Sequence, residues 1–123
     1  MTYDLKERTR KFAYDCIKLA TAITKNDLGN IVRRQLLRAA TSVAANYRAA
    51  YIAPTRKAFG QKLSICAEEA DECNFWLILI IDQGYRLLSN SREAHKLSDE
   101  ATELTRIFVA SRKTIAKDPP CQA

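Results

Sequence analysis

The sequence has 123 residues, 47% hydrophobic and 28% charged, with only three Gly and three Pro. So few turn-forming residues argue against a many-stranded sheet and against disorder, while the length suits one domain with its own core. The protein is basic, with 20 Lys and Arg against 14 Asp and Glu. The excess lies in residues 1–62, which hold 13 basic and four acidic residues, while residues 63–123 hold seven basic and ten acidic ones.

The first predicted helix covers residues 4–24. Its apolar residues follow one another at intervals of four and three, the spacing of a helix face that packs against other helices. Asp4 is the expected N-cap, with Glu7 three residues later. The helix-breaking residues in 25–30 then predict a turn.

The second predicted helix covers residues 31–53 and the third covers residues 55–84, both with the same apolar spacing. Pro54 ends the second helix, because the residue before a proline is pushed out of the helical region. Thr55 is the expected N-cap of the third helix, and Gly84 is its expected C-terminal stop.

The fourth predicted helix covers residues 90–117, with Asn90 or Ser91 at its start, and residues 118–123 are expected to form a disordered tail. Short connections between long helices favour antiparallel neighbours. We therefore predict an all-α fold in which residues 1–117 form one domain, an antiparallel up-down-up-down four-helix bundle.

The third helix carries more apolar surface than one bundle covers. Residues 75–81 are apolar on every face of the helix, whereas each helix of a four-helix bundle keeps an outer face. We expect self-association through Phe75, Trp76, Ile78 and Leu79. The alternative is a central helix that its own bundle buries completely.

The uneven charge distribution has two interpretations. The basic and acidic halves attract each other within a bundle or between subunits, or the basic face binds a polyanion such as RNA. No named nucleic-acid-binding motif is present. The predicted polyanion contacts are basic side chains of the second helix and of the start of the third: Arg33, Arg34, Arg38, Arg48, Arg56 and Lys57.

The densest acidic feature is the segment around residues 68–72. Such a cluster suits a cation, but folding the third helix back on the second favours a different interpretation. It places Arg34 and Arg38 opposite Glu69, Asp71 and Glu72, and arginine suits forked pairing with carboxylates. We predict structural ion pairs among these five residues, within or between chains.

Signals for catalysis or metal binding are weak. The single histidine, His95, has Arg92 three residues before it, where a di-iron bundle needs Glu. No paired Cys or His spacing suits zinc, and neither a phosphate-binding glycine loop nor a nucleophile elbow is present. We expect no enzymatic activity, no metal and no cofactor; a pair of one cysteine with His95 is the alternative.

The expected compartment is the cytoplasm. The first residues lack the apolar core of a secretory signal, and residues 75–81 are too few to span a bilayer, so no membrane contact is expected. The four cysteines form no CxxC pair. Cys16, Cys66 and Cys73 are expected to be small buried residues in a reducing environment, and Cys121 is expected to be exposed.

Two blocks of the sequence resemble a known family. They are RQLLRAATSVAANYR at residues 34–48 and FGQKLSICAEEADE at residues 59–72, the second followed by Trp76-Leu77. Both are similar to the bacterial four-helix-bundle proteins first noticed as reading frames inside intervening sequences of 23S ribosomal RNA genes. The resemblance extends from about Leu5 to Ala110.

The resemblance implies an antiparallel four-helix bundle that assembles as a closed ring, a homopentamer, with no established enzymatic activity and no catalytic residues. A related branch, the accessory proteins of diversity-generating retroelements, uses a basic barrel to hold reverse transcriptase and RNA. Residues 47–51 depart from the family pattern, since many relatives end the second helix with a more acidic, Gly-containing segment. We expect an oligomeric scaffold or adaptor with RNA as a candidate partner; the alternative is a pure protein–protein interaction module.

Overall fold

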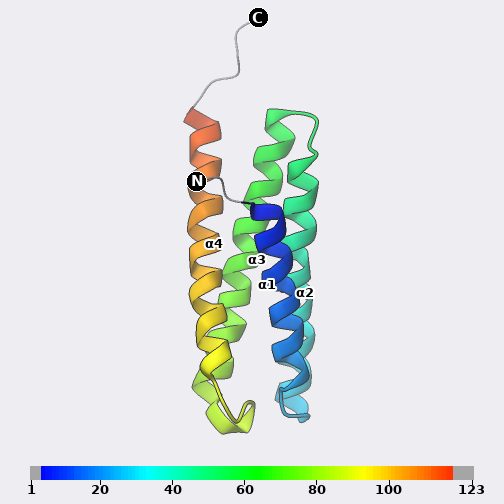
Figure 1. Cartoon of the computed structure of the whole chain (residues 1–123), viewed down its shortest axis with the longest axis vertical. Coiled ribbons are helices and arrows are strands. Elements are labelled where there is room, and N and C mark those ends of the chain that lie inside the picture. Colours follow the sequence, from blue (N-terminus) through cyan, green and yellow to red (C-terminus); the bar gives the residue numbers. More distant parts are fainter. Residues whose placement is uncertain (1–3, 118–123) are drawn as a thin grey trace, which may run out of the picture.

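The structure, a computed structural model, describes residues 4–117 and contains four helices but no strand within that range. In Figure 1 the sequence colours run down α1, up α2, down α3 and up α4. A short 3-10 turn, Gly84–Arg86, follows α3. The predicted all-α fold with four helices is confirmed. The helices have these bounds: α1 Leu5–Thr21, α2 Asp27–Tyr51, α3 Arg56–Gln83 and α4 Arg92–Lys117.

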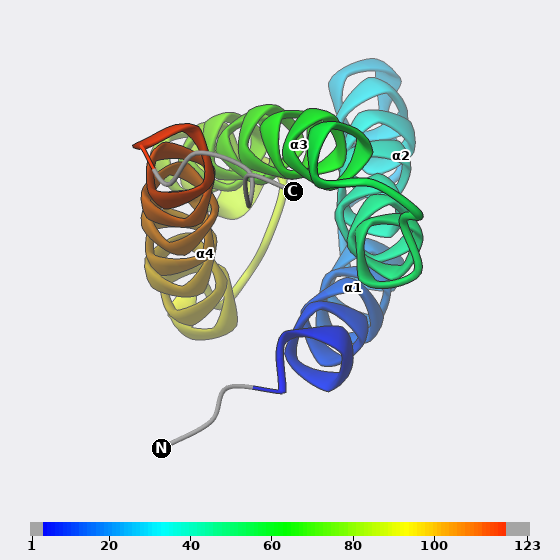
Figure 2. The same ribbon diagram turned by 90° about the horizontal axis from the view of Figure 1, so that it is seen from above.

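The helix α3 is the centre of the arrangement. Seen from above, it lies between α2 and α4, while α1 lies beside α2 (Figure 2). It packs along both of these neighbours, whereas α1 and α4 touch each other far less. One link between α1 and α4 is a forked ion pair, in which the Nε and Nη2 atoms of Arg8 lie 2.7 and 2.8 Å from the carboxylate oxygens of Glu100.

The predicted helix ends are largely confirmed. The carboxylate of Asp4 accepts a hydrogen bond from the backbone N–H of Glu7 at 3.1 Å, and the hydroxyl of Thr55 accepts one from that of Ala58 at 3.0 Å. Such caps satisfy backbone donors that the first turn of a helix leaves unpaired. Gly84 ends α3 with a φ of +62°, in the left-handed region that favours glycine.

The start of α2 was predicted four residues too late. Asn26 is its N-cap, accepting a hydrogen bond from the backbone N–H of Gly29 at 2.7 Å, so helix α2 begins at Asp27. A Cβ atom on Gly29 would lie 1.9 Å from the carbonyl oxygen of Thr24. This glycine therefore permits a close approach of the α1–α2 turn, and it does not break the helix.

The core follows the predicted four-three spacing along all four helices. The largest side chains at its centre come from every helix: Phe12, Leu36, Leu63, Leu77, Leu104 and Phe108. The thiols of Cys16, Cys66 and Cys73 are free and buried among them, as expected. Burial raises the pKa of the Cys16 and Cys66 thiols to about 12, so both stay protonated and behave as small apolar groups. Cys121 and the predicted tail lie outside the described residues.

Among residues 4–117, no helix combines the length and the apolar character that crossing a membrane requires.

Replacing Gly29 with alanine tests the close approach at the α1–α2 turn. We expect Gly29→Ala to lower the free energy of unfolding by at least about 2 kcal/mol, because the new methyl group meets backbone that cannot move aside. The matched control is Gly60→Ala, also in a helix, where a Cβ atom meets nothing closer than 3.9 Å. The control should gain about 0.5–1 kcal/mol from helix propensity. Urea unfolding at one fixed protein concentration measures both, and equal effects would contradict this role of Gly29.

Candidate functional site

The outer face of α3 is apolar and open in the single chain. Phe75 is 57% exposed and Ile78 is 44% exposed, while Trp76 and Leu79 are half-buried beside them. The rings of Phe75 and Trp76 meet edge to face with their centroids 4.9 Å apart. A shallow groove of about 250 Å³ follows this face, with Asp82 at its far end. The bundle therefore does not bury α3 completely, and the alternative of a fully enclosed central helix is wrong.

A network of charged side chains fastens α2 to α3 next to this face. The guanidinium of Arg38 lies 3.2 Å from the carboxylate of Glu69 and also donates to the carboxylate of Glu72. Glu72 accepts a second hydrogen bond, at 3.1 Å, from the indole N–H of Trp76. Hydrogen bonding from Arg38, with a smaller contribution from Trp76, lowers the pKa of the Glu72 carboxyl. The ion pairs thus hold an aromatic side chain of the apolar face in place.

The other two residues of the predicted ion-pair set stand apart. Within residues 4–117, neither Arg34 nor Asp71 takes part in an ion pair, and both are exposed. Adjacent residues on a helix point about 100° apart, so Asp71 faces outward where its neighbour Glu72 faces α2. The structure brings Arg38 together with Glu69 and Glu72 and leaves Arg34 and Asp71 free of that network.

Two of the residues predicted as polyanion contacts form hydrogen bonds with helix ends of their own chain. Arg33 donates to the carbonyl oxygens of Ala20 and Ile23, at 3.2 and 2.6 Å, at the end of α1. Arg56 donates to the carbonyl oxygen of Ile115, at 3.4 Å, near the end of α4. A cation at a helix C-terminus satisfies unpaired carbonyls and opposes the helix dipole. Sequence reasoning missed this role because the bonds join different helices.

The remaining predicted basic contacts do not form one patch. Arg48 lines a groove between α1 and α2, and Lys57 lines another between the start of α3 and the end of α4. Arg34 is exposed elsewhere on α2. We call the first of these the α1–α2 groove; it has a volume of about 290 Å³ and was not predicted. Its lining comes from both helices: Lys6, Glu7, Arg10, Ala13, Tyr14, Ile17, Thr41, Ala44, Ala45 and Arg48.

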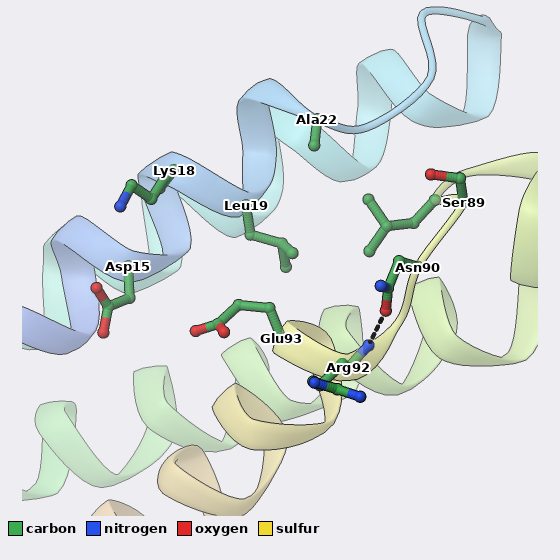
Figure 3. Close-up of a pocket in the computed structure, with 9 residues that line it drawn as sticks. Asp15, Lys18, Leu19, Ala22, Ser89, Asn90, Arg92 and Glu93 are labelled. Atoms are coloured by element: carbon green, nitrogen blue, oxygen red, sulfur yellow. Dashed lines mark hydrogen bonds between the residues drawn. The ribbon is translucent and has the colours of Figure 1, made fainter.

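A fourth hollow, of about 470 Å³, lies between α1 and the start of α4 (Figure 3). Its charged residues balance, with Asp15 and Lys18 on α1 opposite Arg92 and Glu93 on α4. No cluster of three or more His, Cys, Asp and Glu side chains is placed to hold a metal ion anywhere in residues 4–117. His95 is exposed and approaches the carbonyl oxygen of Ser91, at 2.9 Å, while the described cysteines are buried, so no Cys–His pair forms among them.

The loss of Arg38 tests the network between α2 and α3. We expect Arg38→Ala to lower the free energy of unfolding at pH 7 by about 0.5–1 kcal/mol, since solvent weakens a half-exposed pair. Because folding lowers the pKa of Glu72, this stabilisation is present above pH 4.5 and is lost as the pH falls through the folded-state pKa. The control is Arg34→Ala, one helical turn away. Equal losses for the two variants, or a difference that persists in acid, would contradict this role.

Comparisons with known proteins agree on one family. A model of the family described as "23S rRNA-intervening sequence protein" matches residues 1–110. The fold is similar to the crystal structure of a protein with unknown function from the S23 ribosomal protein family of Bacteroides thetaiotaomicron. That structure is 28% identical in sequence, the match covers 88% of this chain and 97% of that chain, and the TM-score is 0.74. A search of the curated proteins found no match.

Proposed function

This chain belongs to the family of 23S rRNA-intervening sequence proteins, and from that membership and its geometry we propose that it is a non-enzymatic, cytoplasmic scaffold or adaptor. In this proposal the chain is an antiparallel up-down-up-down bundle that self-associates into a ring of five subunits. The subunits meet through the outer face of α3. A basic surface of the ring then holds RNA.

The observation that carries the proposal is the exposed apolar face of α3. Phe75 and Ile78 lie side by side on one helix with more than two-fifths of their surface open to solvent. Contiguous apolar surface of this kind is typical of protein interaction sites. Burial against another chain would remove it from water at a gain of about 25 cal/mol per Å².

The RNA part of the proposal rests on charge. Residues 1–62 carry a large excess of Lys and Arg, and Arg34 and Lys57 have exposed side chains. Such side chains bind phosphates without sequence specificity and release counterions as they do so.

A second function, a pure protein–protein interaction module, is favoured by a different observation. Three of the six predicted polyanion contacts, Arg33, Arg38 and Arg56, bond to groups of their own chain. In this alternative the basic half serves subunit pairing and the internal fastening of helices, and no nucleic acid is involved.

The mass in solution tests self-association. We expect light scattering to give a multiple of the 13.9 kDa chain, with five copies as the proposed number. The double variant Phe75→Gln/Ile78→Gln should give single copies with unchanged helicity, because it removes the apolar contact and keeps good helix formers. The control, Ile52→Gln/Tyr85→Gln, removes two even more exposed apolar side chains elsewhere and should still assemble. A wild-type protein that stays single would overturn the proposal.

A salt series separates the two functions. If RNA binds through the basic surface, affinity in a gel-shift assay with single-stranded RNA should fall steeply as salt rises, and Lys57→Ala, at an exposed site outside the α1–α2 groove, should reduce the slope by about one. The purified protein should also carry nucleic acid, seen as high absorbance at 260 nm. A flat salt response together with protein free of nucleic acid would favour the pure interaction module.

A further inference from the structure

Acidic residues flank a pair of apolar residues along the outer face of α3. Successive members are three or four residues apart, so they share one side of the helix. All are exposed. We call this line the α3 stripe, and it consists of Glu68, Asp71, Phe75, Ile78 and Asp82. It extends for about 21 Å at the helical rise per residue.

The carboxylates of the α3 stripe have no cationic partner among the residues that the structure describes. Within residues 4–117, no ion pair includes Glu68, Asp71 or Asp82. The α3 stripe thus presents two apolar side chains flanked by three unpaired negative charges. A second α3 stripe is a poor partner for it, because the contact would bring like charges together.

The α1–α2 groove has the opposite character. Lys6, Arg10 and Arg48 line it with a single acid, Glu7, which pairs with Arg10 at 2.5 Å. The net charge of the groove is therefore positive.

The shape of the α1–α2 groove suits a helix. Its lining includes small side chains on the α2 side, Thr41, Ala44 and Ala45, which allow another helix to approach closely. Tyr14, which is 61% exposed, and Ile17 supply apolar contact on the α1 side. The groove also offers cations near one end and apolar surface beside them.

We propose that the α1–α2 groove of one copy receives the α3 stripe of a neighbouring copy. Phe75 and Ile78 would pack on Tyr14, Ile17 and the alanines, while the acids of the stripe face the cations of the groove. A second copy is the occupant favoured by charge, because each chain carries one acidic stripe and one basic groove. This inference rests on the proposed self-association and names the surface that completes it.

The proposed contact is heterologous, since two different surfaces meet. Such contacts close into a ring when the rotation between copies allows it and otherwise continue as a filament. The α3 stripe begins near the middle of α3 and extends almost to its end, whereas the α1–α2 groove is lined by residues 6–17 of α1 and residues 41–48 near the end of α2. Docked copies are therefore offset along their long axes, and in a closed ring the bundles are inclined to the ring axis.

Mixing two variants tests the heterologous contact. The stripe variant is Phe75→Gln/Ile78→Gln, and the groove variant is Ala45→Glu, which adds bulk and negative charge at an exposed helical alanine. Each variant alone should be a single copy by light scattering, with its dissociation constant raised at least tenfold. An equimolar mixture should form pairs of two copies and stop there, because the mixture offers one intact stripe and one intact groove per pair.

Controls keep the outcomes distinct. Ala110→Glu places the same change at an exposed alanine of α4 and should assemble like the wild type. Arg48→Glu is a second groove variant, and circular dichroism checks the helicity of all of them. A single wild-type chain would defeat the proposed function itself. Normal assembly of both groove variants, or a mixture that stays single, would overturn the stripe-in-groove contact and leave self-association standing.

Discussion

The helix α3 supplies both the centre of the core and the apolar outer face from which the proposed assembly follows. The inner face of this helix supplies Leu63, Leu77 and other side chains of the core, and its flanks pack on α2 and α4. The apolar run of residues 75–81 continues around the helix beyond what these neighbours cover. Exposed apolar surface is costly in water, and the proposed self-association would cover it. A scaffold built from several copies of the chain would bury this apolar surface. For that reason we propose assembly, and not catalysis of a reaction, as the role of the chain.

Several basic side chains form hydrogen bonds and ion pairs within the bundle. Arg38 fastens α2 to α3, and Arg33 and Arg56 close helix ends through backbone carbonyls. These bonds occupy guanidinium groups that the net charge alone counts as a polyanion surface. The acids of the α3 stripe behave differently, because Glu68, Asp71 and Asp82 take part in no ion pair within residues 4–117. The asymmetry between the two halves of the chain therefore becomes an asymmetry between two surfaces, a basic groove and an acidic stripe.

Periodicity predicted the four helices and most of the core, because apolar residues on a buried helix face recur every three or four positions in the sequence. Local signals also located the caps at Asp4 and Thr55. Contacts between helices were harder to predict from the sequence. Arg38 was placed correctly near Glu69 and Glu72, but the outward turn of Asp71 depends on the rotation of α3, and the α1–α2 groove depends on the separation of two helices. Gly29 was misinterpreted as a breaker because its close contact with Thr24 involves a turn whose shape the sequence does not specify.

The fluorescence of Trp76 on dilution reports whether a second copy covers the outer face of α3. Trp76 is the single tryptophan of the chain and lies half-buried beside Phe75 on the outer face of α3. If a second copy covers this face, dilution should redden its emission and increase quenching by acrylamide while the helicity stays constant. Emission and quenching that do not change from micromolar to nanomolar protein, in a chain that light scattering shows to be single throughout, would contradict the account.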